Sequence, residues 1–237
     1  MSECIVSGYN IFMTRNIDFS VGEYYHLYNR GTDKRKIFTG PREYSRFLIL
    51  LYLCNSNTRV DIGDQLRQGL TLSEIFQMDK GEELVGIGCY CLMPNHFHIL
   101  VHEIHEGGIS LFMQKLQTAY TMYFNKKHDR NGSLFQGTFK AQHIAKDVYL
   151  KYLFAYINLN PIKLIDSNWK EDGIKDLNHA KEFLNKYEYS SYLDLIGTQR
   201  IENKILKISE FPEYFNAELK FDDFINEWLQ FKDTDKV

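Results

Sequence analysis

The stretch LVGIGCYCLMPNHFHILVHEI, residues 84–104, contains two apolar runs on either side of Pro94 and Asn95. Proline followed by asparagine is a turn signal, so we predict a β-hairpin with strands at 84–93 and 96–104. Alternation along the second strand directs His96 and His98 to one face of the sheet and Phe97 to the other. One face can then pack against helices, and the histidine face must meet something polar. Later histidines, at 102 and 105, are expected at the surface.

Further strands and helices surround this hairpin. We predict a strand at 23–31, a helix at 41–55, a helix at 110–128 that Ser110 caps, a strand at 138–144 and a helix at 146–160 that ends at Pro161. The polar segment 56–81 is interpreted as a loop with a short helix. This order indicates an α+β protein of ferredoxin-like βαββαβ topology with an antiparallel sheet, one additional helix and a mostly helical C-terminal extension.

The composition limits the classes of protein. A chain of 237 residues with 44% hydrophobic, 15% aromatic and 25% charged residues is typical of a folded soluble protein. No apolar run is long enough to cross a bilayer, and the first residues lack the features of a signal peptide. We therefore expect a cytoplasmic protein without a membrane partner. The four cysteines form no C-x-x-C pair, which favours buried thiols over a disulfide or a zinc site.

Charge is distributed unevenly along the chain. The net charge is −3, yet residues 113–151 include seven basic and two acidic residues, whereas residues 166–237 include 16 acidic and 10 basic ones. A basic middle beside an acidic tail fits a face that binds a polyanion. A solvated helix surface with a chance excess of lysine explains the same counts equally well.

Two groups of polar side chains could carry chemistry. His96 and His98, at i and i+2 on a strand, can offer nitrogens to one cation, or they can be two ordinary histidines of the sheet. Tyr156 and Asn160 lie one helical turn apart, on a face that also holds Tyr152. A phenol is a nucleophile once its proton is removed, and an amide oxygen nearby could complete a metal site. Alternatively, tyrosines at this spacing form an aromatic stripe that only packs in the core.

Five blocks of sequence, taken together, resemble one family. The blocks, in chain order, are HLYNRG (26–31), YCLMPNHFHILV (90–101), GSLFQGTFKA (132–141), YLFAYINLNPIK (152–163) and YEYSSYLDLIG (187–197). They are similar to the single-tyrosine HUH transposases, and most of all to the REP-associated tyrosine transposase branch. The resemblance extends over residues 24–197. Asn160 stands where insertion-sequence members usually have glutamine, and Phe135 and Thr138 stand where the branch tends to have tryptophan and arginine.

The resemblance implies an enzyme that cleaves and rejoins single-stranded or hairpin DNA through a covalent 5′-phosphotyrosine. It implies that His96 and His98 bind a metal ion, that Asn160 helps to hold it and that Tyr156 is the nucleophile. Mg²⁺ or Mn²⁺ suits such ligands. The basic residues then become candidates for contacts with the DNA backbone. They are Arg30, Arg35, Lys115, Lys126, Lys127, Arg130, Lys140 and Lys146.

The expected organisation is an N-terminal arm at 1–22, a catalytic domain at 23–165 and a helical extension at 166–237. We interpret the extension as a structural cap, although partner binding is left open. A nucleoid-associated location and a homodimer are also compatible with the sequence. Two alternatives to the transposase stay open: a domesticated protein that binds DNA hairpins without strand transfer, and a metal-dependent phosphodiesterase in which water attacks.

Overall fold

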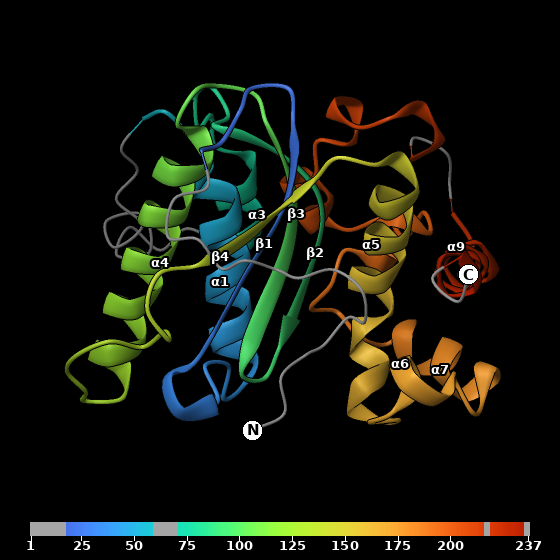
Figure 1. Cartoon of the computed structure of the whole chain (residues 1–237). Helices are drawn as coiled ribbons and strands as arrows, with labels where there is room; N and C mark the ends of the chain where they lie inside the picture. Colours follow the sequence, from blue (N-terminus) through green and yellow to red (C-terminus); the bar gives the residue numbers. More distant parts are fainter. Residues whose placement is uncertain (1–17, 59–70, 216–218, 235–237) are drawn as a thin grey trace.

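A computed structural model describes residues 18–58, 71–215 and 219–234 (Figure 1). The strands are β1 (Tyr24–Arg30), β2 (Val85–Met93), β3 (His96–Glu103) and β4 (Lys140–Ile144). The α-helices are α1 (Pro41–Cys54), α3 (Leu72–Gln77), α4 (Gly108–Lys127), α5 (Asp147–Leu159), α6 (Trp169–Asp172), α7 (Leu177–Leu184), α8 (Tyr192–Leu195) and α9 (Phe221–Thr234). The 3₁₀ helices are η1 (Thr32–Lys34), η2 (Asn160–Leu164), η3 (Ile201–Ile205), η4 (Ile208–Glu210) and η5 (Glu213–Phe215). Most of the predicted arm, including Cys4, and part of the predicted loop lie outside the described residues.

The four strands form one antiparallel sheet in the order β2-β3-β1-β4. Strand β3 lies between β1 and β2, and β4 pairs with the other edge of β1. This is the strand order of the ferredoxin-like βαββαβ topology, so the predicted fold class is confirmed. The hairpin predicted at residues 84–104 is the pair β2–β3, with Met93 opposite His96 next to the turn.

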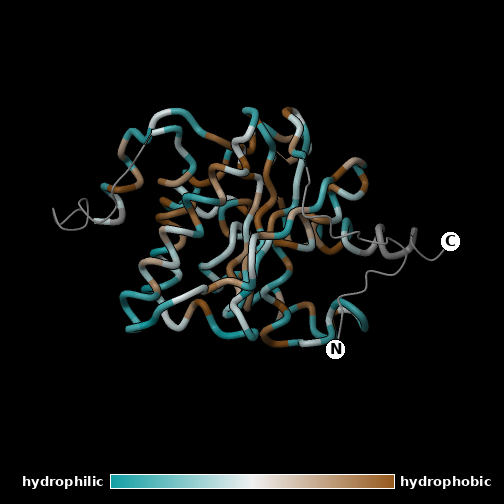
Figure 2. Tube along the Cα trace, turned by 60° about the vertical axis from the view of Figure 1, so that its left-hand side comes forward, coloured by the Kyte–Doolittle hydropathy of each residue, from teal (hydrophilic) through white to brown (hydrophobic). Residues whose placement is uncertain are grey.

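Helices α1 and α4 pack together over one face of the sheet (Figure 1). The apolar side chains of β3, Phe97, Ile99 and Val101, are fully buried in the cluster beneath these helices. Figure 2 shows the hydrophobic residues along the central strands and hydrophilic residues along the outer turns. The alternation of β3 therefore fixes which face of the sheet receives α1 and α4, as the sequence predicts.

The opposite face of the sheet receives α5, and α9 packs against α5 from outside (Figure 1). A second apolar cluster fills this layer and includes Leu100 of β3, Phe154 of α5 and Trp228 of α9. The C-terminal extension is thus part of a core that also contains the sheet and α5. Within the described residues, no helix combines the length and apolar character needed to cross a membrane. Cys54, Cys89 and Cys91 are free and buried, as expected.

Two glycines of β2 allow the extension to approach the sheet closely. A Cβ at Gly88 would lie 2.6 Å from the ring of Phe211, and one at Gly86 would lie 2.9 Å from the Cβ of Glu210. The same segment covers His102, whose Nδ1 lies 3.6 Å from a carboxylate oxygen of Glu210. The predicted surface position of His102 is wrong because a distant segment covers it. His105 is exposed, as expected.

Helix α4 begins earlier than predicted. It starts at Gly108, so Ser110 lies inside the first turn and does not cap the helix. The buried carboxylate of Glu103 takes the capping role and accepts a hydrogen bond from the backbone N–H of Ile109 at 2.8 Å. A Cβ at Gly108 would overlap the carbonyl oxygen of Leu84, so only glycine fits at this position. The cap comes from the preceding strand, which a search for a local serine does not reveal.

Pro161 does not end the helical segment. Helix α5 ends at Leu159, and η2 continues the chain in a tighter turn with the proline in its first turn. Proline is tolerated there because its missing N–H would have no partner in the helix. Asn160 therefore lies at the junction of α5 and η2, buried to 3% exposure.

Asn55 links the end of α1 to the start of β2. Its Oδ1 accepts hydrogen bonds from the N–H groups of Leu84 and Val85, and its Nδ2 donates to the Val85 carbonyl, all in a buried position. We expect Asn55→Ala to lower the free energy of unfolding by about 2–4 kcal/mol, because three buried hydrogen bonds are lost. Urea unfolding followed by circular dichroism measures this change. The control Asn57→Ala removes one exposed hydrogen bond to Glu82 and should change the free energy of unfolding by less than about 0.5 kcal/mol. If both variants lose the same free energy, the stabilising role of Asn55 is contradicted.

Candidate active site

His96 and His98 lie on the face of β3 that α5 covers. Their ring centroids are 5.1 Å apart, and their strand partners on β1 are Arg30 and Tyr28 respectively. His98 is buried, whereas His96 is only partly covered. The alternation of the strand therefore brings the two imidazoles together on one side of the sheet.

A third histidine, which the sequence analysis did not select, joins this pair. His26 of β1 is buried, and its Nε2 lies 2.8 Å from Nδ1 of His98. The signal for it was present, because alternation along β1 places His26, Tyr28 and Arg30 on one face. This signal can be used only once it is known that β1 lies beside β3.

Hydrogen bonds orient the imidazole rings. Nδ1 of His96 lies 2.6 Å from Oδ1 of Asn95, whose Nδ2 in turn donates to the Lys34 carbonyl. The amide oxygen can only accept, so Nδ1 of His96 carries the proton and its Nε2 carries the lone pair. In His98 the Nδ1 is engaged by His26, and the tautomer that donates there leaves the lone pair on Nε2. Both rings can thus present Nε2 as a ligand atom.

The environment favours the neutral form of all three histidines. Burial, followed by the positive charges of Lys163 and Arg30, lowers the pKa of His96 to about 4. Burial and the charge of Lys170 lower the pKa of His26 to about 3. Burial lowers the pKa of His98 well below its ordinary value, and the neighbouring imidazoles lower it further. A metal ion requires neutral imidazole, so these rings are in the form that ligation needs.

Tyr156 of α5 packs against His98. Its ring meets that of His98 edge-on, with centroids 5.9 Å apart, and stacks on Tyr152 at 6.1 Å and on Trp169 at 6.2 Å. Tyr152 is buried to 5% exposure, whereas Tyr156 is only partly covered. Of the two tyrosines, the one that borders the histidines is also the more accessible.

The side-chain oxygen of Asn160 supports the fit of a cation. Its Oδ1 is buried and has no hydrogen-bond partner among the described residues, which is costly unless another ligand satisfies it. Clusters of three or more His, Cys, Asp or Glu side chains suited to a metal ion are absent from the described part of the chain. The predicted donor set is of another kind, since it would pair two imidazoles with an amide oxygen. Such a set is compatible with Mg²⁺ or Mn²⁺.

Only some of the predicted basic residues lie near the histidines. Arg30 pairs with His96 across the strands and Lys140 pairs with Tyr28, so both belong to the histidine face. Arg35 follows η1 and bonds to the Thr32 carbonyl, and Lys146 directly precedes α5. The remaining four lie on α4 or just after it, across the sheet from the histidines (Figure 1). They are Lys115, Lys126, Lys127 and Arg130.

Several of these α4-side cations have structural partners. Lys115 donates hydrogen bonds to the carbonyls of Ser56 and Thr58. Lys127 forms an ion pair with Glu43, whose carboxylate is buried. The structure instead places Lys163 and Lys170 near the histidines, where their charges lower the imidazole pKa values. The sequence analysis missed both, since they lie beyond the basic segment at 113–151.

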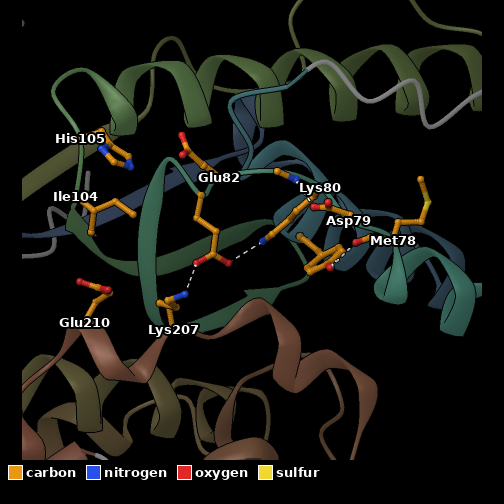
Figure 3. A pocket seen from close by; sticks show the side chains of 11 residues that line it. Met78, Asp79, Lys80, Glu82, Ile104, His105, Lys207 and Glu210 are labelled. Carbon is orange, nitrogen blue, oxygen red and sulfur yellow. Dashed lines mark hydrogen bonds and ion pairs between the residues drawn. The ribbon is translucent and has the colours of Figure 1, made fainter.

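A separate hollow of about 470 Å³ lies elsewhere on the molecule (Figure 3). Glu83 pairs there with Lys80 at 2.9 Å and with Lys207 at 3.3 Å, and the lining also holds Asp79, Glu82 and Glu210. None of the predicted site residues lines it. With four acidic and two basic side chains in its lining, the hollow does not favour an anion.

Comparisons with known proteins relate the chain to transposases. The family model described as IS200-like transposase matches residues 21–160. A solved structure of a REP-associated tyrosine transposase bound to a REP hairpin aligns with a TM-score of 0.46 and 14% sequence identity. That alignment covers 85% of this chain and 90% of the other. No curated protein matches the sequence significantly.

The buried contact between His26 and His98 should stabilise the site. We expect His26→Phe to lower the free energy of unfolding by about 1–3 kcal/mol, because it leaves Nδ1 of His98 buried without a partner. Urea unfolding is measured for His26→Phe, for His98→Phe and for the double variant. The three changes in unfolding free energy give the coupling between the two histidines, expected at about 1 kcal/mol. The matched control is His105→Phe at an exposed position. A coupling of zero would show that the contact contributes nothing.

Proposed function

Because this chain belongs to the family of IS200-like transposases, we propose that it is a metal-dependent transposase that cleaves and rejoins single-stranded or hairpin DNA. Family membership supports the transposase class. The observation that supports the mechanism is the contact of the Tyr156 ring with His98, which shares its face of the sheet with His96. We infer that a nucleophile and cation ligands meet on this face, with the buried Asn160 oxygen, which has no hydrogen-bond partner among the described residues, as the third ligand.

The proposed reaction is a displacement at phosphorus. The phenolate oxygen of Tyr156 forms a bond to the scissile phosphorus, and the bond from phosphorus to the 3′ oxygen breaks. The electron pair of that bond goes to the 3′ oxygen, which takes up a proton and leaves as a free 3′ hydroxyl. The product is a 5′-phosphotyrosine that keeps the energy of the original diester, so rejoining by a 3′ hydroxyl requires no nucleotide hydrolysis.

His96, His98 and Asn160 would hold the divalent cation, Mg²⁺ or Mn²⁺. When bound, such a cation supplies positive charge that offsets the negative charge of the phosphate and polarises phosphorus. His26 and Asn95 engage the Nδ1 atoms of His98 and His96, so the Nε2 atoms would be left for the cation, which is the usual role of partners behind metal ligands. The unpartnered Asn160 oxygen would then gain a partner.

The DNA partner would approach along the histidine face. Arg30 and Lys140 on the sheet, with Lys163 on η2, are the cations best placed to contact its phosphates. We keep the organisation into an arm, a domain at 23–165 and an extension at 166–237 as a proposal. A cytoplasmic, nucleoid-associated location follows from the proposed DNA substrate.

The nucleophile can be tested by trapping the covalent adduct. A pool of labelled hairpin oligonucleotides with randomised single-stranded flanks is incubated with protein and Mn²⁺, and adducts are separated on a denaturing gel. We expect wild type and Tyr152→Phe to form the adduct and Tyr156→Phe to form none, because only the last loses the attacking oxygen. Blunt duplexes of the same length should give no adduct.

An adduct with Tyr156→Phe but not with Tyr152→Phe would place the nucleophile one helical turn earlier. A wild-type protein that binds the hairpins yet forms no adduct would favour the domesticated hairpin-binding protein. Cleavage without an adduct would favour attack by water.

The cation site can be tested by Mn²⁺ binding, measured from the loss of the free-ion electron paramagnetic resonance signal. We expect wild type to bind Mn²⁺, and His96→Gln and Asn160→Leu each to weaken binding by at least about tenfold, since loss even of a partner behind a ligand costs that much. The control His105→Gln should bind as wild type does. Unchanged affinity in both site variants would refute this ligand set, whatever the outcome of the adduct assay.

A further inference from the structure

Lys170, on α6 of the C-terminal extension, reaches over the ring of Tyr156. Its Nζ lies 4.8 Å from the ring centroid, a distance at which an ammonium group interacts with an aromatic face. The side chain is partly covered, so it is neither buried in the core nor fully in solvent. The proposed nucleophile therefore has a cation from the extension beside it.

The charge of Lys170 also affects two of the three histidines. It contributes to the lowered pKa values of both His26 and His98, which lie on two different strands. Its Nζ contacts the Tyr156 ring, which meets His98 edge-on, so Lys170 lies on the same side of the sheet as the histidines. Any phosphate placed between the tyrosine and the histidines would come within reach of the same charge.

The neighbouring Trp169 holds Lys170 in this position. Its indole is buried to 1% exposure, stacks on Tyr156 and meets Trp228 of α9 at 5.0 Å. The turn is closed by a hydrogen bond from the N–H of Gly173 to the carbonyl of Trp169 at 3.0 Å. Because the adjacent residue is fixed on both sides, the backbone that carries Lys170 is fixed too.

We propose that Lys170 is a catalytic residue that binds a non-bridging oxygen of the scissile phosphodiester. The proposal rests on the proposed function, because it assigns a role in the attack by Tyr156. As the phenolate bond to phosphorus forms and the bond to the 3′ oxygen breaks, negative charge on the non-bridging oxygens increases, and a preorganised ammonium stabilises it. The extension would then complete the active site as well as cover the core.

The test measures single-turnover adduct formation with a hairpin oligonucleotide selected by the wild-type protein. Lys170→Met keeps the length of the side chain and removes its charge, and we expect the rate to fall by about 100-fold. Lys170→Arg should recover a substantial part of the rate because it restores a cation. The matched control is Lys181→Met, which removes another extension lysine that lies 6.0 Å from an aromatic centroid, that of Phe221, away from the site. Its rate should equal that of wild type.

Substituting sulfur for each non-bridging oxygen in turn separates catalysis from packing. If Lys170 contacts one of these oxygens, one of the two diastereomers should slow wild type more than it slows Lys170→Met. Equal slowing in both proteins would overturn the proposal, as would a wild-type rate in Lys170→Met. A loss confined to hairpin affinity at constant salt would also overturn it, since that would make Lys170 a binding residue.

The outcomes also distinguish a failure of the role of Lys170 from a failure of the proposed function on which it rests. Adduct formation by wild type with no effect of Lys170→Met rejects the role of Lys170 and leaves the proposed function intact. Absence of any adduct in wild type rejects the tyrosine mechanism, and the role of Lys170 with it. Thermal unfolding of each variant shows whether a lost rate reflects a lost fold.

Discussion

On β3, successive side chains must point to opposite faces of the sheet. Because Phe97, Ile99 and Val101 enter the core under α1 and α4, His96 and His98 are forced into the layer beneath α5. A slip of one residue in the pairing would exchange the two sets and place imidazoles in the larger apolar core. The position of the site is therefore a consequence of how the sheet buries its apolar face.

The second layer has to be apolar enough to pack and polar enough to hold the histidines. It meets both needs by pairing buried polar groups with one another: His26 with His98, and Asn158 with Ser191, whose hydroxyl donates to the Asn158 side-chain oxygen at 2.8 Å. Oδ1 of Asn160, like the hydroxyl of Ser190, is buried and has no such partner among the described residues. Native structures rarely leave such atoms unsatisfied, and Asn160 follows Tyr156 by one helical turn, with the Tyr156 ring in contact with His98.

Periodicity was sufficient to predict the four strands, the helices α1, α4 and α5, and their order, since each signal lies within one element. The same patterns place His96, His98 and Tyr156 on the faces where the structure brings them together. Features that depend on contacts between distant segments were missed. Glu103 replaced Ser110 as the cap of α4, and Lys170 reached the site from the extension, because both need the tertiary arrangement first. The pairing partner of His98 was missed for the same reason.

The charge pattern along the chain has a different meaning once it is folded. The basic segment at 113–151 spans α4 and β4, and its α4 part lies across the sheet from the histidines, with Lys115 and Lys127 bonded to other parts of the fold. The cations near the histidines come from separate parts of the sequence: Arg30 from β1, Lys163 from η2 and Lys170 from the acidic extension. A small cluster of this kind is compatible with a net charge of −3, because phosphate attraction is screened within about 10 Å at ordinary ionic strength. At that range the local arrangement of cations, and not the overall charge, determines where a phosphate binds.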